Sequence, residues 1–241
     1  TPKRGEKTIQ NITIRDMLTM TAPYKYRSTP YTKYFTCPDW VRFSLDLLGG
    51  KGPVGEFRYA PLIGPDILTG ILTRVTGQSV LDFAKEHLFA PLGIPVDQSI
   101  TFRSREELMV FYKSTDLRVW AADPAGVNAG GWGLTLSPMD LAKLGQLYLD
   151  GGVWNGQRLV SERWVRESTA EQSRWAERDL PYGYLWWVLP QEHGFAALGD
   201  GGNALYVSPD KNLVAAITSR FQPRVKDRIE LIRTYVAPCF D

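Results

Sequence analysis

Apolar residues recur at helical spacing along much of the first two thirds of the chain. The clearest series comprises Ile67, Leu68, Ile71, Leu72 and Val75. These positions share one face of a helix, and Gly77 follows them where a C-terminal cap belongs. Ser79 then begins a second helix, which ends at Pro91 and Gly93. The pattern therefore predicts two consecutive helices between residues 67 and 92.

Other helices are predicted mainly by their capping residues. Thr13 and Asp16 have the capping-box spacing at the start of a helix over residues 12–18. Ser137 and Ser161 each precede a further helical segment. Residues 21–56 are rich in Tyr, Pro, Thr and Gly, so we expect a long irregular connection there, interrupted by a short helix at residues 40–48.

The periodicity changes in the last quarter of the chain. Residues 182–188 are aromatic and β-prone, and two strand-like runs, 204–207 and 213–219, flank a turn. Apolar positions between Val225 and Val236 predict a final helix. This order predicts an α+β fold, a helical region packed on an antiparallel sheet, and not a doubly wound parallel sheet. We expect one unit over residues 1–241, mainly helical over 1–175, with the sheet and the C-terminal helix in 176–241.

Charge and length narrow the classes of partner. Lys and Arg total 28 against 26 Asp and Glu, without a basic block, so nucleic acid is not an expected partner. No apolar run reaches the roughly 18 residues of a membrane span. The chain starts at Thr1 and not at Met, so we expect its natural N-terminus to lie upstream.

Cysteine and histidine are scarce. Cys37 and Cys239 lie far apart and predict free thiols rather than a disulfide framework. His87 falls at the end of a predicted helix and His193 at a predicted hairpin tip, where we expect solvated side chains. Two histidines cannot build a histidine-based metal cluster and leave little for a Ser-His-Asp triad. We therefore expect no metal and no cofactor.

Familiar catalytic motifs are missing from the sequence. It has no Gly-x-Ser-x-Gly, no phosphate-binding loop and no dinucleotide fingerprint, and the glycine-rich run at residues 49–52 predicts a turn. One Ser-x-x-Lys match occurs, from Ser208 to Lys211, in the predicted hairpin turn. Pro209 inside it suits a turn and not a nucleophile-bearing helix, so we interpret the match as chance.

Seven short segments instead form an ordered set. They are residues 13–21, 57–61, 91–94, 130–134 with Ser137 and Asp140, 151–156, 182–187 and 199–207. In this order they resemble the serine β-lactamase and penicillin-binding-protein superfamily, specifically its class C-like and esterase branch. Each segment alone is a weak signal, but together they span nearly the whole chain.

The resemblance implies an acyl-enzyme mechanism. A serine three residues before a lysine attacks an acyl carbon, the lysine and a tyrosine move the proton, and two backbone N–H groups hold the oxyanion. Since the chain has no fitting Ser-x-x-Lys, we expect the nucleophile helix and some sheet strands upstream of Thr1. The expected substrate is a small-molecule or peptide-like ester or amide.

Tyr59 matches the motif tyrosine and would relay the proton, provided that a lysine lowers its pKa. The alternative is a tyrosine that only anchors the following helix. Pro61 replaces the asparagine that the family has two residues after the tyrosine, so that amide is absent or supplied elsewhere.

Asp200 is the second departure, because the resemblance implies lysine or histidine there. A carboxylate would repel anionic substrates and favour neutral or cationic ones, unless it pairs structurally with an arginine. Gly201 and Gly202 would let a substrate approach the strand, and the backbone N–H of Asn203 is the expected second oxyanion donor. The same residues would also fit a simple loop before a strand.

Three functions remain open at this point. The chain is a serine hydrolase of the β-lactamase-related family, or a non-catalytic ligand-binding member with Pro61 and Asp200 as signs of lost chemistry. As a third possibility, it needs a separate N-terminal complementing segment to complete its sheet. A Ser-x-x-Lys in the upstream coding sequence favours catalysis over binding, and size measurement with and without that segment tests the third.

Overall fold

The fold centres on a six-stranded antiparallel sheet in a computed structural model that describes residues 7–115, 117–221 and 224–240. Its spatial order is β10-β9-β8-β7-β6-β5, so each strand pairs with its neighbour in sequence. The strands are β5 (Ser173–Trp175), β6 (Leu180–Tyr182), β7 (Trp187–Leu189), β8 (Gly194–Gly199), β9 (Asn203–Ser208) and β10 (Leu213–Ile217). The predicted α+β class with an antiparallel sheet is confirmed.

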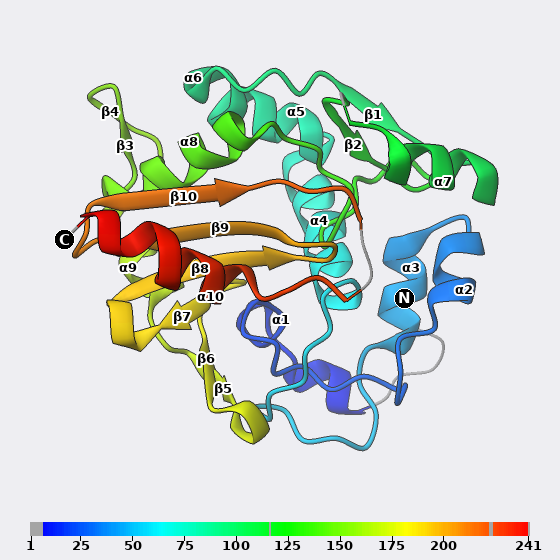
Figure 1. Ribbon diagram of the computed structural model, residues 1–241. Helices are drawn as coiled ribbons and strands as arrows, with labels where there is room; N and C mark the ends of the chain where they lie inside the picture. The colour runs from blue at the N-terminus through cyan, green and yellow to red at the C-terminus, as the bar shows by residue number, and fades with distance from the viewer. Residues whose placement is uncertain (1–6, 116, 222–223, 241) are drawn as a thin grey trace.

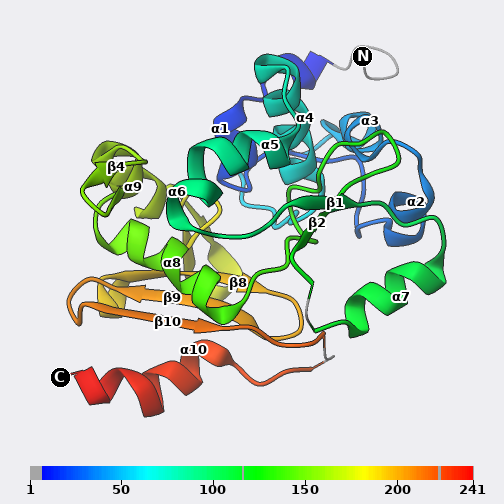
Figure 2. The same cartoon turned by 90° about the horizontal axis from the view of Figure 1, so that it is seen from above.

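Helices cover both faces of the sheet, as Figure 2 shows: α8 (Pro138–Leu149) lies on one face and α10 (Arg228–Leu231) on the other. The chain continues from α10 as a π-helical turn (Ile232–Val236) and a 3-10 turn (Ala237–Phe240). Ile229 and Ile232 pack with buried Tyr206 on the α10 side. Gly145 lets α8 approach closely, since a Cβ there would lie 2.6 Å from Val214 Cγ1. The result is a three-layer arrangement around this part of the core.

The remaining helices gather beside the sheet, with α2, α3 and α7 on the side of the molecule away from the C-terminus in Figure 1. They are α1 (Ile14–Leu18), α2 (Tyr31–Thr36), α3 (Trp40–Leu47), α4 (Ile63–Thr76), α5 (Val80–Ala84), α6 (Ala90–Leu92), α7 (Arg105–Lys113) and α9 (Glu162–Thr169). Two small sheets complete the fold: β1 (Gln98–Ile100) parallel to β2 (Val119–Ala121), and the hairpin of β3 (Val153–Trp154) and β4 (Gln157–Arg158). No helix in the described ranges is long and apolar enough to cross a membrane.

The predicted caps form as the sequence indicates. Thr13 and Asp16 bond reciprocally at the start of α1, and Ser137 accepts from Asp140 N at the start of α8. Ser161 caps α9 in the same way. Gly77 ends α4 in the left-handed conformation, with φ 71°. These local signals fixed the helix ends because each satisfies backbone groups that a helix end leaves unpaired.

Three predictions differ from the structure in their detail. Residues 182–188 do not form one strand: Tyr182 ends β6, Trp187 begins β7, and a turn lies between them. Gly183 in this turn packs closely against the end of α9, since a Cβ there would lie 2.2 Å from Ser168 O. Helix α4 begins at Ile63, earlier than the apolar series indicates, because Pro65 fits a first turn. Helix α2 was not predicted.

Candidate active site

Tyr59 lies in the segment between α3 and α4 and is held by its neighbours in the chain. Arg58 N donates to Met20 O at 2.6 Å, and Ala60, only 1% exposed, directs its N–H at the Met20 sulfur. The Tyr59 ring is 39% exposed. Its centroid lies 5.4 Å from that of Trp187 and 6.3 Å from that of Trp175, both on the sheet. The backbone is thus fixed, and the partly exposed ring lies against the aromatic side chains of the sheet.

The environment of Tyr59 raises the pKa of its phenol. Burial is the main cause, followed by the negative charge of Asp200 and by Tyr31 of α2. The expectation that a lysine lowers this pKa is therefore not met within the described residues. Tyr59 stands as a neutral phenol at neutral pH, which suits a proton donor better than a base.

Asp200, Gly201 and Gly202 form the tight turn between β8 and β9. The Asp200 side chain is exposed and makes no ion pair with any residue in the described part of the chain, so the alternative of a structural arginine partner finds no support there. Its charge raises the pKa of Tyr59 and also that of Tyr112 on α7. Asp200 consequently lies near both phenols.

The protein's own donors occupy the carbonyl groups of this turn. Asn203 Nδ2 donates to Asp200 O at 3.1 Å, the Ser219 hydroxyl donates to Gly201 O, and Arg228 Nε donates to Gly202 O at 3.4 Å. Asn203 Oδ1 accepts in turn from Ser219 N at 2.9 Å. In a trans peptide the N–H points opposite to the C=O. The N–H of Asn203 is therefore directed away from Arg228.

Both glycines of the turn have left-handed φ values, 80° for Gly201 and 97° for Gly202. A Cβ on Gly202 would also lie 2.9 Å from Arg228 Nε. Glycine is therefore needed here for conformation and for space. The sequence-based alternative of a simple loop is correct as geometry, since these residues do form a hairpin turn.

Ser208 and His193, which the sequence analysis did not assign to the site, lie away from it. Ser208 ends β9 with its side chain buried, and the following residues form the β9–β10 turn. His193 lies at an exposed hairpin tip, where its Nδ1 is 2.6 Å from Asp210 Oδ2. This carboxylate raises the pKa of His193. Among the described residues no cluster of three or more acidic, His or Cys side chains could hold a metal.

Trp132 and Tyr112 form an aromatic wall that the sequence analysis did not predict. Trp132 packs against Tyr112 with ring centroids 6.3 Å apart, and Tyr112 also contacts Phe221 at 5.8 Å. Trp132 belongs to the glycine-rich loop before α8, whose backbone lies against Pro61: a Cβ on Gly131 would be 1.8 Å from Pro61 O. The backbone of Pro61 thus packs directly against this loop.

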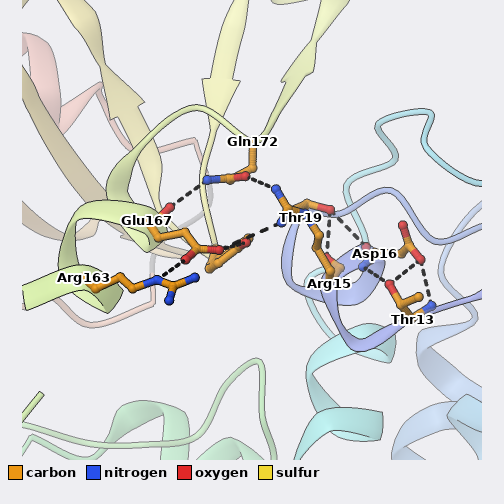
Figure 3. A network of polar contacts seen from close by, with 8 residues as sticks. Thr13, Arg15, Asp16, Thr19, Arg163, Glu167 and Gln172 are labelled. Carbon is orange, nitrogen blue, oxygen red and sulfur yellow. Dashed lines mark hydrogen bonds and ion pairs between the residues drawn. The ribbon is translucent and has the colours of Figure 1, made fainter. Parts of the chain in front are cut away.

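On the opposite side, α1 is tied to the strands that carry Trp175 and Trp187. Figure 3 shows Arg15 of α1 reaching Gln172 and Glu167, and Tyr184 OH donates to the same Glu167 carboxylate at 2.8 Å. The Ser173 hydroxyl donates to Thr19 O at 2.6 Å. Exposed ion pairs contribute little individually, but the bonds together fix α1 against β5.

Residues 1–237 match the Beta-lactamase family. The chain belongs to the β-lactamase family. This β-lactamase-family chain is 31% identical over 175 residues to a 6-aminohexanoate-dimer hydrolase of Paenarthrobacter ureafaciens, a match that covers 68% of the chain and 39% of that protein. The chain thus spans well under half of the curated relative.

Solved structures of β-lactamase-family proteins share the fold. A family VIII carboxylesterase aligns with 97% of this chain and 72% of its own, with a TM-score of 0.65 and 16% identity. A penicillin-binding protein homologue from Caulobacter crescentus covers 88% of this chain and 66% of its own, with a TM-score of 0.61 and 17% identity. The resemblance drawn from the seven segments is confirmed.

Proposed function

We propose that this chain is part of a serine hydrolase that cleaves an ester or amide through an acyl-enzyme. The observation that carries the proposal is the convergence of Tyr59 and the β8–β9 turn. Asp200 of that turn lies near enough to Tyr59 to raise the pKa of its phenol. Family membership alone gives a hydrolase fold; this pairing of a phenol with a glycine turn supports the chemistry.

In the proposed reaction a serine hydroxyl adds to the acyl carbon and its proton passes to a lysine amine. Tyr59, neutral at physiological pH, donates its proton to the leaving oxygen or nitrogen as the C–O or C–N bond breaks. The lysine ammonium then returns a proton to the phenolate. We propose that the serine and lysine come from outside these 241 residues, since the chain's single Ser-x-x-Lys lies in the β9–β10 turn.

The oxyanion would be held at the β8–β9 turn. Arg228 and Ser219 engage the turn from one side, which leaves the N–H of Asn203 directed to the other. A fixed backbone donor stabilises developing charge because it needs no reorganisation during the reaction. Gly201 presents no side chain, which would let an acyl group approach this part of the turn.

We infer a cationic group in the substrate from Asp200. Its carboxylate is exposed, and its negative charge raises the pKa of both Tyr59 and Tyr112. A carboxylate with aromatic rings nearby is a suitable environment for a cation. The related 6-aminohexanoate-dimer hydrolase is consistent with this inference. A linear 6-aminohexanoate dimer has a free amino group at one end and a carboxylate at the other, and its amide bond lies between them, so we propose that the amino end lies beside Asp200. An anionic substrate would be repelled.

Two experiments test the proposal. The 241-residue chain alone should neither hydrolyse p-nitrophenyl esters nor react with a fluorophosphonate probe, whereas the protein with the Ser-x-x-Lys segment should do both. Stoichiometric labelling of the chain alone would place the nucleophile within it and overturn this assignment. If the complete protein binds an amino-terminal amide without cleaving it, the ligand-binding function holds instead.

A further inference from the structure

Asp66 is a carboxylate in the first turn of α4 with 1% of its surface exposed. Its Oδ2 accepts from the Tyr34 hydroxyl at 2.6 Å, and its Oδ1 accepts from Gly130 N at 2.9 Å. Tyr34 is fully buried on α2 and accepts in turn from Trp132 Nε1 at 3.0 Å. One carboxylate therefore joins three segments that are far apart in sequence.

Each of these segments borders the candidate site. Helix α4 continues directly from the Tyr59 segment, and Gly130 precedes Trp132, whose ring packs against Tyr112. Tyr112 in turn lies near Asp200. The loop cannot move back from α4 without losing a close backbone contact, since a Cβ on Gly130 would lie 2.2 Å from Pro65 O. The Asp66 side chain makes its hydrogen bonds to Tyr34 and Gly130, and not to Tyr59 or Asp200.

We infer that Asp66 is a positioning residue: its buried carboxylate holds Tyr34 and Gly130 and, through them, sets the aromatic wall formed by Trp132 and Tyr112. Burying a charge without an arginine or lysine partner is costly and is tolerated where hydrogen bonds replace water. A carboxylate is the acceptor that serves Tyr34 and Gly130 at once. This inference deepens the proposed function, because it concerns the wall of the same site.

The groups that face Asp66 explain its response to pH. Burial raises the pKa of Asp66 to about 6, while the bonds from Tyr34 and Gly130 lower it and the carboxylate of Asp123, after β2, raises it. On protonation, Asp66 Oδ2 becomes a donor to Tyr34, whose own O–H then loses its acceptor. The Tyr34 oxygen is no longer polarised by a carboxylate, so its bond from Trp132 Nε1 weakens.

The test follows the indole N–H signal of Trp132 by nuclear magnetic resonance in the 241-residue chain, assigned with Trp132→Phe. In the wild-type chain this signal should move between pH 8 and 5 with a midpoint near the Asp66 value of about 6. Asp66→Asn should abolish the movement. Asp123→Asn is the matched control, because Asp123 is an equally buried carboxylate that bonds Trp40 N and Val127 N instead. It should keep the movement and shift its midpoint to lower pH, because the negative charge of Asp123 helps to raise the pKa of Asp66.

Two further measurements keep the inference falsifiable. If Asp66→Asn does not fold, Tyr34→Phe, which keeps the ring, should make the Trp132 signal insensitive to pH. Hexylamine, a cation with an apolar chain, should bind the wild-type chain and Asp123→Asn alike but Asp66→Asn several-fold more weakly. A titration of Trp132 that survives in Asp66→Asn or in Tyr34→Phe overturns the inference. Failure of hexylamine to bind any chain, with the titration intact, instead contradicts the proposed substrate class.

Discussion

Arg228 Nε lies 3.4 Å from the carbonyl oxygen of Gly202 and so joins the C-terminal helix to the turn between β8 and β9. The Ser219 hydroxyl bonds the carbonyl of Gly201, the residue before it. Two donors from the C-terminal segment therefore hydrogen-bond to adjacent carbonyl groups of the turn. The bond from Arg228 orients the Gly202–Asn203 peptide group and with it the N–H of Asn203. The C-terminal segment therefore takes part in shaping the proposed oxyanion site.

Gly202→Ala should lower the free energy of unfolding by more than backbone strain alone would, because it also displaces the Arg228 side chain from its bond to Gly202 O. The new Cβ would lie 2.9 Å from Arg228 Nε, whereas Gly156, at φ 79°, has open space around its Cβ position. Gly156→Ala is thus a matched control for a left-handed φ, with an expected cost of about 1 kcal/mol. Gly202→Ala should cost about 0.5–1.5 kcal/mol more, because the flexible Arg228 side chain must move aside and lose its bond to Gly202 O. Urea unfolding measures both.

The activity of these two variants separates the turn from general stability. In the complete protein Gly202→Ala should lower kcat for a p-nitrophenyl ester at least tenfold, because the oxyanion donor shifts. Gly156→Ala should retain wild-type kcat. Equal stability and equal kcat in the two variants would show that the turn neither is crowded by Arg228 nor holds the oxyanion.

Tyr59→Phe should reduce kcat of the complete protein at least tenfold, the lower end of what removing a proton donor costs, roughly 10²–10⁴ in general. The ring packing against Trp187 and Trp175 is retained, so the melting temperature should stay close to that of the wild type. Tyr31→Phe is the control and should keep wild-type kcat. Tyr31 also raises the pKa of Tyr59, but it is an exposed residue of α2. A Tyr59→Phe enzyme with wild-type kcat would leave only the anchoring role.

The charge of Asp200 should be visible in the titration of Tyr59. Asp200 is the second cause, after burial, of the raised pKa of Tyr59. Asp200→Asn removes that negative charge, so the pKa should fall while remaining above its ordinary value. Carbon-13 tyrosine labelling, with Tyr59→Phe to assign the signal, measures the change. Because a neutral phenol is the active form, the alkaline limb of kcat should move to lower pH in Asp200→Asn.

Substrate charge gives an independent test of Asp200. In the complete protein kcat/KM should be higher for 6-aminohexanoyl p-nitroanilide, which is cationic, than for the uncharged hexanoyl p-nitroanilide. Asp200→Asn should erase most of that preference, which amounts to a factor of about 1.5–5 for one exposed charge pair. Added salt should reduce the wild-type preference and leave the variant unchanged. The same preference in both proteins would remove Asp200 from substrate recognition.

The sequence predicted the features that depend on residues close together in the chain, namely helix ends and turns. Ser137 and Gly77 mark helix ends, and the turn before Leu213 separates two strands, because caps and turns are satisfied locally. It did not predict Asp66, a carboxylate inside an apolar series, since its partners Tyr34 and Gly130 are 32 and 64 residues away. Nor did it reveal the role of Arg228, because the bond to Gly202 depends on how the C-terminal helix lies over the sheet.

The raised pKa of Asp66 also predicts how stability depends on pH. The pKa is about 6 in the folded chain, against an ordinary carboxyl value of 3.8. Between these values the folded chain binds more protons than the unfolded chain, so this group's contribution is fully present below pH 4 and is lost as pH rises through 6. Asp66→Asn should therefore remove a decline of about 1–3 kcal/mol in the free energy of unfolding over that window.

Urea unfolding at several pH values measures this decline in the wild type, Asp66→Asn and Asp123→Asn. Other carboxylates titrate in the same window, so the quantity to compare is the difference between each variant and the wild type. Burial also raises the pKa of Asp123, so its variant should lose a part of the decline that belongs to Asp123 and keep the part that belongs to Asp66. If the slope of Asp66→Asn between pH 4 and 7 equals that of the wild type, the Asp66 carboxyl does not titrate in this window. The bonds from Tyr34 and Gly130 would then hold it ionised throughout, and the aromatic wall would respond to pH through another group.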